Sequence, residues 1–271
     1  MPPPRRSPGA GQQAVGYWND IADGWRHDRD HVWRAHSDAV NVALCRRWLP
    51  RTPDGRLLKT DLFDEATGVG LLGALGDHAR RVEGIDRSLS VAGRARARQG
   101  RLCVTVTDVR DLPFAAHSFD TVVSNSTLDH FPNAGDIARS LSELRRVMVD
   151  GGRLVITLDN AWHPLVALRN ALPVTWLIRL GLVPYYVGRT LGPRAASELL
   201  EQLGFRVLAV TAVLHCPRVA MVPLARLAGR RGGASARARL FLRLTWMFEH
   251  AERLPTRLYT GHFVALLAVK T

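Results

Sequence analysis

Cysteine is scarce in this sequence of 271 residues. The three cysteines, at positions 45, 103 and 216, lie too far apart for a disulfide framework or for the paired ligands of a zinc site. A neighbouring His215 does not change this, because no second ligand pair accompanies it. We therefore expect no metal site, and we expect a reducing compartment, the cytoplasm.

Lysine is also nearly absent, although the chain is basic. Lys59 and Lys270 are the only lysines among 37 basic residues, and the formal net charge is +13. The arginines are scattered, with local clusters at 94–98 and 226–243, which favours solvated surface arginine over a nucleic-acid track. A non-catalytic nucleic-acid binder is thus a minor alternative, motivated by charge alone. Anionic small molecules and lipid headgroups are the better candidate partners.

Long hydrophobic runs are missing as well. No stretch of about 18 uncharged apolar residues exists, and the nearest approach, 173–188, is interrupted by Arg179. We expect no membrane span, which leaves peripheral contact with a membrane open. The opening MPPPRRSPGAGQQ has no apolar core, so we predict no signal peptide and a disordered tail over residues 1–16. Residues 17–271 have enough apolar content, 46% over the chain, for a single domain.

The pattern along the chain alternates strands and helices. Alternation of apolar strands with helices predicts an α/β fold, a doubly wound parallel sheet covered on both faces. Two helices come first, and helical insertions are expected near 161–190 and 217–255. The predicted helices are 17–26, 32–49, 70–79, 89–99, 135–149 and 193–203, and the predicted strands are 56–64, 81–86, 102–107, 121–125, 153–158, 205–213 and 261–270.

A glycine-rich turn follows the first predicted strand in LLKTDLFDEATGVGLL, residues 57–72. After Asp64, residues Ala66, Gly68 and Gly70 have the spacing of a G-x-G-x-G turn, in which backbone N–H groups approach a ligand at a helix N-terminus. The next strand ends at Asp86, about 20 residues on, where an acid commonly binds ribose hydroxyls. This order of elements indicates a nucleotide-type site.

Two charges lie inside the first predicted strand. Lys59 and Asp61 are two residues apart and therefore share one face of a strand. We expect a mutual ion pair, or pairing with Arg56 or the helix at 32–49, because buried charges need partners. A role in binding substrate is the less favoured alternative.

Four segments in order resemble the class I S-adenosylmethionine-dependent methyltransferases of the small-molecule type: LFDEATGVG, VEGIDRS, TDVRDLPFAAHSFDTVVSNSTLDHF and LRRVMVDGGRLVIT. The resemblance covers about residues 56–158. It implies a Rossmann-like, mostly parallel sheet of seven strands with the last antiparallel, and S-adenosyl-L-methionine as cofactor. The residues that it implies around the methionine part are Asp64, Glu65, Ala66, Gly68 and Gly70. It implies Asp86 with Arg87 at the ribose, and Asp108 and Val109 at the adenine. It places Asn125 and Ser126 beside the sulfonium, and Tyr17 where it would close over the cofactor.

Two positions depart from the pattern of that family. Ala66 replaces the first glycine and could crowd the methionine moiety, and Glu65 adds negative charge beside Asp64. These departures motivate a second hypothesis, a methyltransferase-like fold that runs non-methyl chemistry on a nucleotide or nucleoside-sugar substrate.

Catalysis of methyl transfer to a hydroxyl requires a base. His130 is the first candidate, and Asp129 and His36 are the second choices. Residues 129 and 130 follow the fourth strand, and open α/β sheets carry their catalytic residues after the carboxyl ends of strands. A surface turn at 129–130 and simple helix solvation at His36 are the alternatives. The expected acceptor is a small or lipid-linked molecule, such as a sugar, a nucleoside or a secondary metabolite of the antibiotic type.

The segment 162–186 is apolar and aromatic, and prolines at 164, 173 and 184 divide it. Proline interrupts helices, so we predict short helices rather than one long one. Because the segment follows the fifth strand, we expect it to cap the carboxyl ends of the strands and to close over the acceptor. Its packing on the second insertion alone is the competing interpretation.

Overall fold

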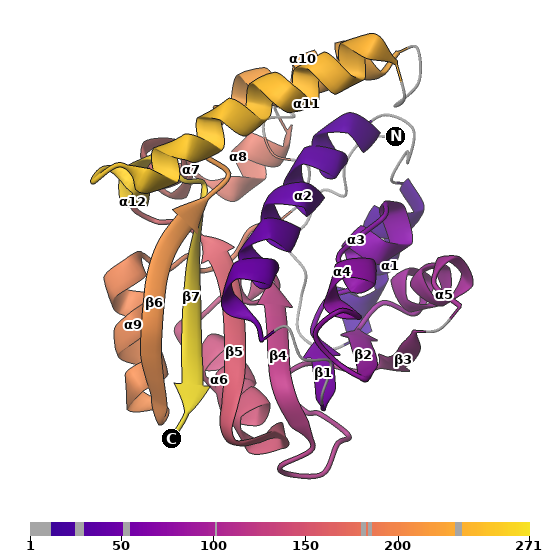
Figure 1. Ribbon diagram of the computed structural model, residues 1–271, viewed down its shortest axis with the longest axis vertical. Helices are drawn as coiled ribbons and strands as arrows, with labels where there is room; N and C mark the ends of the chain where they lie inside the picture. Colours follow the sequence, from indigo (N-terminus) through magenta and orange to yellow (C-terminus); the bar gives the residue numbers. More distant parts are fainter. Residues whose placement is uncertain are drawn as a thin grey trace.

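A seven-stranded sheet forms the centre of the molecule (Figure 1). The computed structural model describes residues 12–24, 30–50, 55–100, 102–179, 183, 186–230 and 235–271. The strand order is β3-β2-β1-β4-β5-β7-β6, and β7 runs antiparallel to both neighbours. The strands are β1 Arg56–Lys59, β2 Arg81–Asp86, β3 Cys103–Val106, β4 Phe119–Asn125, β5 Met148–Asp159, β6 Phe205–Val213 and β7 Phe263–Lys270. The predicted fold class is confirmed.

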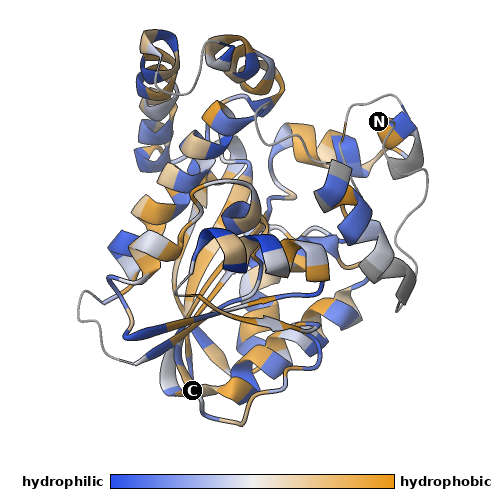
Figure 2. Cartoon of the chain, turned by 90° about the vertical axis from the view of Figure 1, so that its right-hand side faces the viewer, coloured by the Kyte–Doolittle hydropathy of each residue, from blue (hydrophilic) through white to orange (hydrophobic). Residues whose placement is uncertain are grey.

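Helices cover both faces of the sheet (Figure 1). Leu144 of α6 and Leu200 of α9 pack into one apolar cluster, whereas Leu44 of α2 and Ala238 of α11 pack into a second cluster. Figure 2 shows hydrophobic residues running along the central strands. The helices are α1 Gln12–Gly24, α2 His31–Trp48, α3 Phe63–Thr67, α4 Leu72–Leu75, α5 Leu89–Arg98, η1 Leu128–His130, α6 Ala134–Val147, α7 Pro164–Asn170, α8 Val174–Arg179, α9 Pro193–Gln202, α10 Arg218–Gly229, α11 Ala236–Phe248, η2 Glu249–Arg253 and α12 Arg257–Thr260.

The topology gathers the ends of the parallel strands at one edge. The pairs β1–β2, β1–β4, β2–β3 and β4–β5 are parallel, so these strands end at the same edge. Because β7 is antiparallel to β5 and to β6, β6 ends at that edge too. Ligand sites of open α/β sheets lie at this edge. None of the helices described is long and apolar enough to cross a membrane.

Three predicted boundaries are corrected. The first strand ends at Lys59 rather than at 64, because the carboxylate of Asp61 accepts a hydrogen bond from Phe63 N (2.9 Å) and turns the chain into α3. The helix predicted over 70–79 shortens to α4, which contains Gly73 and is followed by Gly76. Helix α1 starts at Gln12, so the disordered tail predicted for 1–16 does not extend to residues 12–16, which include helix-favouring Gln and Ala. Residues 1–11 lie outside the described residues.

The first insertion has the short helices expected from its prolines. Helix α7 begins at Pro164 and α8 follows Pro173. Residues 180–182, 184 and 185 lie outside the described part, as do 231–234 at the basic tip of the second insertion. The remaining predicted helices and strands differ from the observed ones by a few residues at their ends.

Candidate active site

A buried ion pair explains why the first strand tolerates charge. Lys59 Nζ lies 2.8 Å from Glu65 Oε2, and both side chains are fully buried. The ammonium also donates to the carbonyl oxygen of Asp61. Burial disfavours the charged amine, but the charges of Glu65, Asp61 and Asp64 outweigh burial and hold the pKa of Lys59 above its usual value. The expected mutual pair of Lys59 and the Asp61 carboxylate is corrected: Lys59 pairs with Glu65 of α3, and Arg56 pairs with Glu83.

Glu65 also stabilises the glycine turn through its side chain. Its second carboxylate oxygen accepts a hydrogen bond from Leu71 N (2.8 Å). Gly70 has φ +66°, and a Cβ there would lie 2.6 Å from Glu65 Oε1. Glycine is therefore required at position 70 by the approach of this carboxylate as well as by its backbone conformation. Both oxygens of Glu65 are engaged inside the protein, so the structure assigns it to the support of the turn rather than to contact with the cofactor.

Ala66 does not face the turn. Its side chain is buried, packed in an apolar cluster with Leu62 of the preceding loop and with Val91 and Ala95 of α5. The methyl group points into the core because α3 places position 66 on its inner side. The hypothesis that Ala66 crowds the methionine moiety is corrected accordingly.

Four carboxylates surround the turn and form what we call the acid cluster: Asp38, Asp61, Asp64 and Asp86. Asp38 accepts a hydrogen bond from Gly70 N (3.1 Å), and Asp64 pairs with Arg34 of α2 (2.9 Å). Burial raises the pKa of Asp38 to about 7, with Asp64 adding to the rise. Burial, then repulsion by Asp86, raises the pKa of Asp61 well above its usual value.

Asp86 ends β2 within this cluster, at the position expected for a ribose ligand. Its two oxygens accept hydrogen bonds from Leu62 N (3.1 Å) and Ser88 N (2.8 Å). Burial raises the pKa of Asp86 to about 6, although these backbone donors oppose the rise. Each oxygen keeps a further lone pair for a ligand hydroxyl.

The acid cluster suits a cation. S-adenosylmethionine carries a sulfonium and an ammonium group, and carboxylates with raised pKa values are stabilised in their charged form by such groups. Burial is the main cause of the raised pKa values of Asp38, Asp61 and Asp86, and the charges of Lys59 and Arg34 offset the rise only in part. The residues present therefore fit this cofactor.

Asp108, expected at the adenine, is engaged by arginines. Arg110 binds both of its oxygens (3.0 and 2.8 Å), and Arg87 lies 3.4 Å away. Burial would raise the pKa of Asp108, but the hydrogen bonds from Arg110 hold it below its usual value. Val109 is buried in the core. The Arg87 Nε atom is buried and has no hydrogen-bond partner among the described residues.

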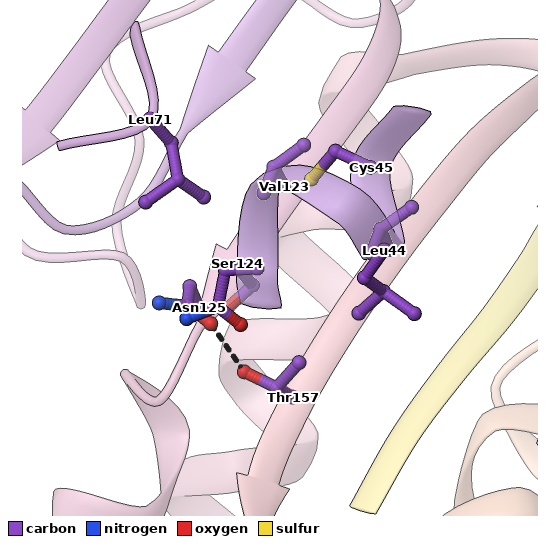
Figure 3. A pocket seen from close by; sticks show the side chains of 9 residues that line it. Leu44, Cys45, Leu71, Val123, Ser124, Asn125 and Thr157 are labelled. Carbon is purple, nitrogen blue, oxygen red and sulfur yellow. Dashed lines mark hydrogen bonds between the residues drawn. The ribbon is translucent and has the colours of Figure 1, made fainter. Parts of the chain in front are cut away.

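Asn125 and Ser126 continue the site from the end of β4. Asn125 Oδ1 accepts a hydrogen bond from Thr157 Oγ1 (2.6 Å), and its amide nitrogen lies 3.4 Å from Asp64. Figure 3 shows this Asn125–Thr157 pair in a small pocket that is also lined by Leu44 of α2. Ser126 has φ +48°, a left-handed conformation uncommon for serine, which turns the chain sharply toward η1.

Asp129 and His130 lie together behind this turn. Asp129 is buried, and its Oδ2 accepts hydrogen bonds from Ser126 Oγ (3.0 Å) and Asp159 N (3.1 Å). Its Oδ1 has no hydrogen-bond partner among the described residues and lies 3.9 Å from His130 Nε2. Burial raises the pKa of Asp129, partly opposed by His130. The alternative of an exposed surface turn is excluded for Asp129.

Two aromatic residues of α1 close this side of the site. The Trp18 ring lies 4.8 Å from the His130 ring, and Tyr17 Oη accepts a hydrogen bond from Tyr186 N (2.7 Å). The first insertion (residues 161–190), which we call the cap, also contacts this side of the site, because Gly188 N donates a hydrogen bond to Asp129 O (2.8 Å). Tyr17 thus joins the cap to α1, at the place where closure over the cofactor was expected. Sequence analysis missed Trp18, although it neighbours Tyr17.

The aromatic residues of the cap do not act as one group. Trp162 stacks on Tyr259 of α12, with ring centroids 5.4 Å apart, and Trp176 is 65% exposed. Tyr186 is the aromatic residue that reaches His130, through a carbonyl 3.3 Å from Nδ1. Tyr185 lies outside the described residues.

His36 lies elsewhere. Its Nε2 is 3.4 Å from Cys216 Sγ and 3.4 Å from Glu249 Oε1, and its ring packs near Trp33 and Trp246. The side chain is buried between α2 and the second insertion, so the proposed role as a catalytic base is corrected. His36, Cys216 and Glu249 are the one group among the described residues whose ligand atoms are close enough to hold a metal ion, within 4.8 Å of one another.

A second polar group, at the ends of β5 and β7, was also missed. Asp159 pairs with Arg169 of α7 (2.6 Å) and lies 3.7 Å from His262. Burial lowers the pKa of His262 to about 3, so this imidazole is neutral. Asp159 ends β5 as Asp86 ends β2, and that shared position is the signal that could have identified it.

Comparison with known proteins agrees with this geometry. The family described as "Methyltransferase domain" matches residues 66–156. A probable S-adenosylmethionine-dependent methyltransferase of Mycolicibacterium smegmatis is 30% identical over 215 residues, which cover 78% of this chain and 72% of that protein. Two further curated relatives are matched over 62% and 49% of their length.

Solved structures share the fold. The [4+2]-cyclase SpnF superimposes with a TM-score of 0.60 at 20% identity, covering 97% of this chain and 96% of that one. Geranyl diphosphate C-methyltransferase from Streptomyces coelicolor superimposes with a TM-score of 0.54 at 15% identity, covering 100% of this chain and 89% of that one. The seven-stranded sheet, the acid cluster and the relative from Mycolicibacterium smegmatis together place the chain in the class I S-adenosylmethionine-dependent methyltransferases, whose methyl donor is S-adenosylmethionine.

Proposed function

We propose that the protein transfers a methyl group from S-adenosylmethionine to a hydroxyl of a small, largely apolar acceptor, with His130 as general base. The observation that carries this proposal is the pairing of His130 with buried Asp129 beside Ser126, at the strand end where the sulfonium is expected. Asp64, Asp86 and the backbone of the glycine turn would hold the cofactor. The transfer needs the acceptor oxygen about 3 Å from the methyl carbon, and water excluded.

The contacts of His130 favour one tautomer. A carbonyl oxygen can only accept a hydrogen bond, so the 3.3 Å contact with Tyr186 O requires the proton on Nδ1. Nε2 then carries the lone pair that a general base needs. As the oxygen–carbon bond forms and the sulfur–carbon bond breaks, Nε2 takes the hydroxyl proton. Asp129 Oδ1, 3.9 Å away, then stabilises the imidazolium.

The acceptor is proposed to be apolar, with an anionic or lipid-linked portion. The first insertion supports this, because Leu165, Leu168 and Trp176 are large apolar side chains exposed on the cap. The similar C-methyltransferase from Streptomyces coelicolor is described with geranyl diphosphate, an apolar chain bearing an anionic group. A secondary metabolite of this chemistry, made in the cytoplasm, would fit three cysteines that are all free thiols.

A second candidate is non-methyl chemistry on the same scaffold. It is favoured by one observation, the likeness to a [4+2]-cyclase over nearly the whole of both chains. A cyclase would bind the cofactor or its product without consuming it. Release of S-adenosylhomocysteine during turnover therefore distinguishes the two candidates.

Calorimetry with S-adenosylhomocysteine tests the cofactor site. We expect micromolar binding, and Asp86→Ala should weaken it by about 1–3 kcal/mol, because ribose hydroxyls lose their acceptor. Asp150→Ala is the control, since Asp150 is exposed at the amino end of β5, at the opposite edge of the sheet. Unchanged affinity in a folded Asp86→Ala variant would remove Asp86 from the site, and absence of binding to the unmodified protein would refute methyl transfer.

Turnover tests the base. The protein would be incubated with S-adenosylmethionine and a panel of hydroxylated isoprenoid and aromatic acceptors, with S-adenosylhomocysteine release as the readout. His130→Gln should bind S-adenosylhomocysteine normally and lose turnover. A His130→Gln variant with full turnover would exclude the imidazole as base.

A further inference from the structure

Helices α10 and α11 of the second insertion carry exposed apolar stripes. On α10, Val219 is 74% exposed and Leu227 is 54% exposed. On α11, Leu240, Leu244 and Met247 are 57%, 51% and 65% exposed. Residues three and four apart share one helix face, so the α11 set is a continuous stripe, and on α10 the exposed Pro223 lies four residues from both Val219 and Leu227 and completes a second stripe. Exposed apolar stripes of this length on neighbouring helices mark interaction surfaces.

These stripes lie on the outer side of the insertion. Both helices pack on each other and on α2. Ala225 of α10 and Ala238 of α11 are buried in the cluster that contains Val32 and Leu44 of α2. The stripes are on the helix faces opposite these alanines, and Figure 1 shows the two helices as the outermost layer of the molecule on this side.

The charge on this surface has one sign. Neither α10 nor α11 contains an aspartate or glutamate. Arg237 and Arg243 are exposed on α11, and Arg230 is exposed at the end of α10. On the helical wheel, Arg237 and Arg243 flank the stripe of Leu240, Leu244 and Met247. Apolar residues bordered by arginine are typical of helices that lie in a membrane interface, where the guanidinium groups reach the phosphates.

We propose that the outer surface of α10 and α11 binds an anionic lipid bilayer peripherally. A second copy of the chain is a poor occupant, because docking two such surfaces would bring arginines of the same sign together. A phospholipid surface supplies both an apolar interior and negative phosphates, which match the stripes and their flanks. This inference goes beyond the proposed function and does not depend on it.

Membrane binding would also orient the candidate active site. The insertion follows the carboxyl end of β6, which lies at the same edge of the sheet as the ends of β4 and β5. Docking through α10 and α11 would therefore hold this edge close to the bilayer, where apolar acceptors partition.

Co-sedimentation with vesicles tests the proposal. The intact protein would be mixed with vesicles of phosphatidylcholine alone, or of phosphatidylcholine with about one third phosphatidylglycerol, at about 0.1 M and about 0.5 M salt. We expect binding to the anionic vesicles, weakened by salt. Leu244→Asp with Met247→Asp should reduce it at least tenfold, and Arg237→Gln with Arg243→Gln should reduce it by about fivefold per charge removed.

Two controls separate the outcomes. Leu208, 47% exposed on β6, is the matched apolar control, and Leu208→Asp should leave vesicle binding unchanged. Binding of S-adenosylhomocysteine, measured on each variant, reports folding independently of lipid. Equal recovery with and without vesicles would overturn the proposal. So would a concentration-dependent dimer that Met247→Asp abolishes, which would identify a second copy as the occupant.

Discussion

The buried Lys59–Glu65 pair allows a quantitative test of how the glycine turn is built. Both side chains are fully buried and their charged atoms are 2.8 Å apart. We expect Glu65→Gln to destabilise the protein by about 3–5 kcal/mol, because it removes the carboxylate that is in direct contact with the buried ammonium. Glutamine keeps an oxygen for the hydrogen bond from Leu71 N, so the loss reports the charge rather than the shape.

The double variant distinguishes pairing from simple burial. Lys59→Met alone should also cost about 3–5 kcal/mol, since it leaves the carboxylate unpaired. Lys59→Met with Glu65→Gln should cost much less than the sum, because neither charge of the pair is left buried without the other, giving a coupling energy of at least about 2 kcal/mol.

Urea unfolding measures these differences as shifts in midpoint at constant slope. Lys270 supplies a matched control, because it is another buried lysine, but its partner Asp150 is exposed and 3.1 Å away. Asp150→Asn should not move the midpoint measurably. Additive costs for Lys59 and Glu65, or a small cost for either single variant, would show that the pair does not hold the turn.

Three further outcomes follow from the site. Ala66→Gly should lower the free energy of unfolding by about 1 kcal/mol, because it removes apolar contacts and raises the backbone entropy of the unfolded chain. It should leave the affinity for S-adenosylhomocysteine unchanged in calorimetry. Tighter binding would restore the hypothesis that Ala66 crowds the methionine moiety. The affinity for S-adenosylmethionine should rise between about pH 5 and 8, as Asp86 and Asp38 ionise with pKa values of about 6 and 7, and Asp38→Asn should remove the upper part of the rise in a calorimetric pH series. These folded-state pKa values lie above the unfolded value of 3.8, so the two carboxyls should make the ligand-free protein less stable as the pH rises from about 4 to about 7. Urea midpoints measured over that range would show the loss, and a flat profile would contradict the raised values. Gly188→Ala should release the first insertion from η1, because the added Cβ would overlap the carbonyl oxygen of Phe131. Amide hydrogen exchange over residues 162–186 should then accelerate, and an added acceptor should no longer slow it. Unchanged exchange would show that the insertion is held elsewhere.

The sequence by itself determined the architecture. The alternation of apolar strands with helices predicted the doubly wound sheet, and the resemblance added the antiparallel last strand, now confirmed in β7. The position of Asp86 at the carboxyl end of its strand also followed from the sequence, because the apolar pattern of that strand stops at this residue. Prolines 164 and 173 predicted the short helices of the cap for a similarly local reason.

Only the tertiary structure decided which charges meet. The partner of Lys59 is Glu65 because α3 folds back beneath the strand, and His36 faces Cys216 and Glu249, 180 and 213 residues away in the chain. The contacts of His36 depend on packing between layers, and the Lys59–Glu65 pair depends on the direction of the turn into α3; local periodicity encodes neither. The same reason explains why Ala66 points into the core, although its spacing matched a ligand-binding turn.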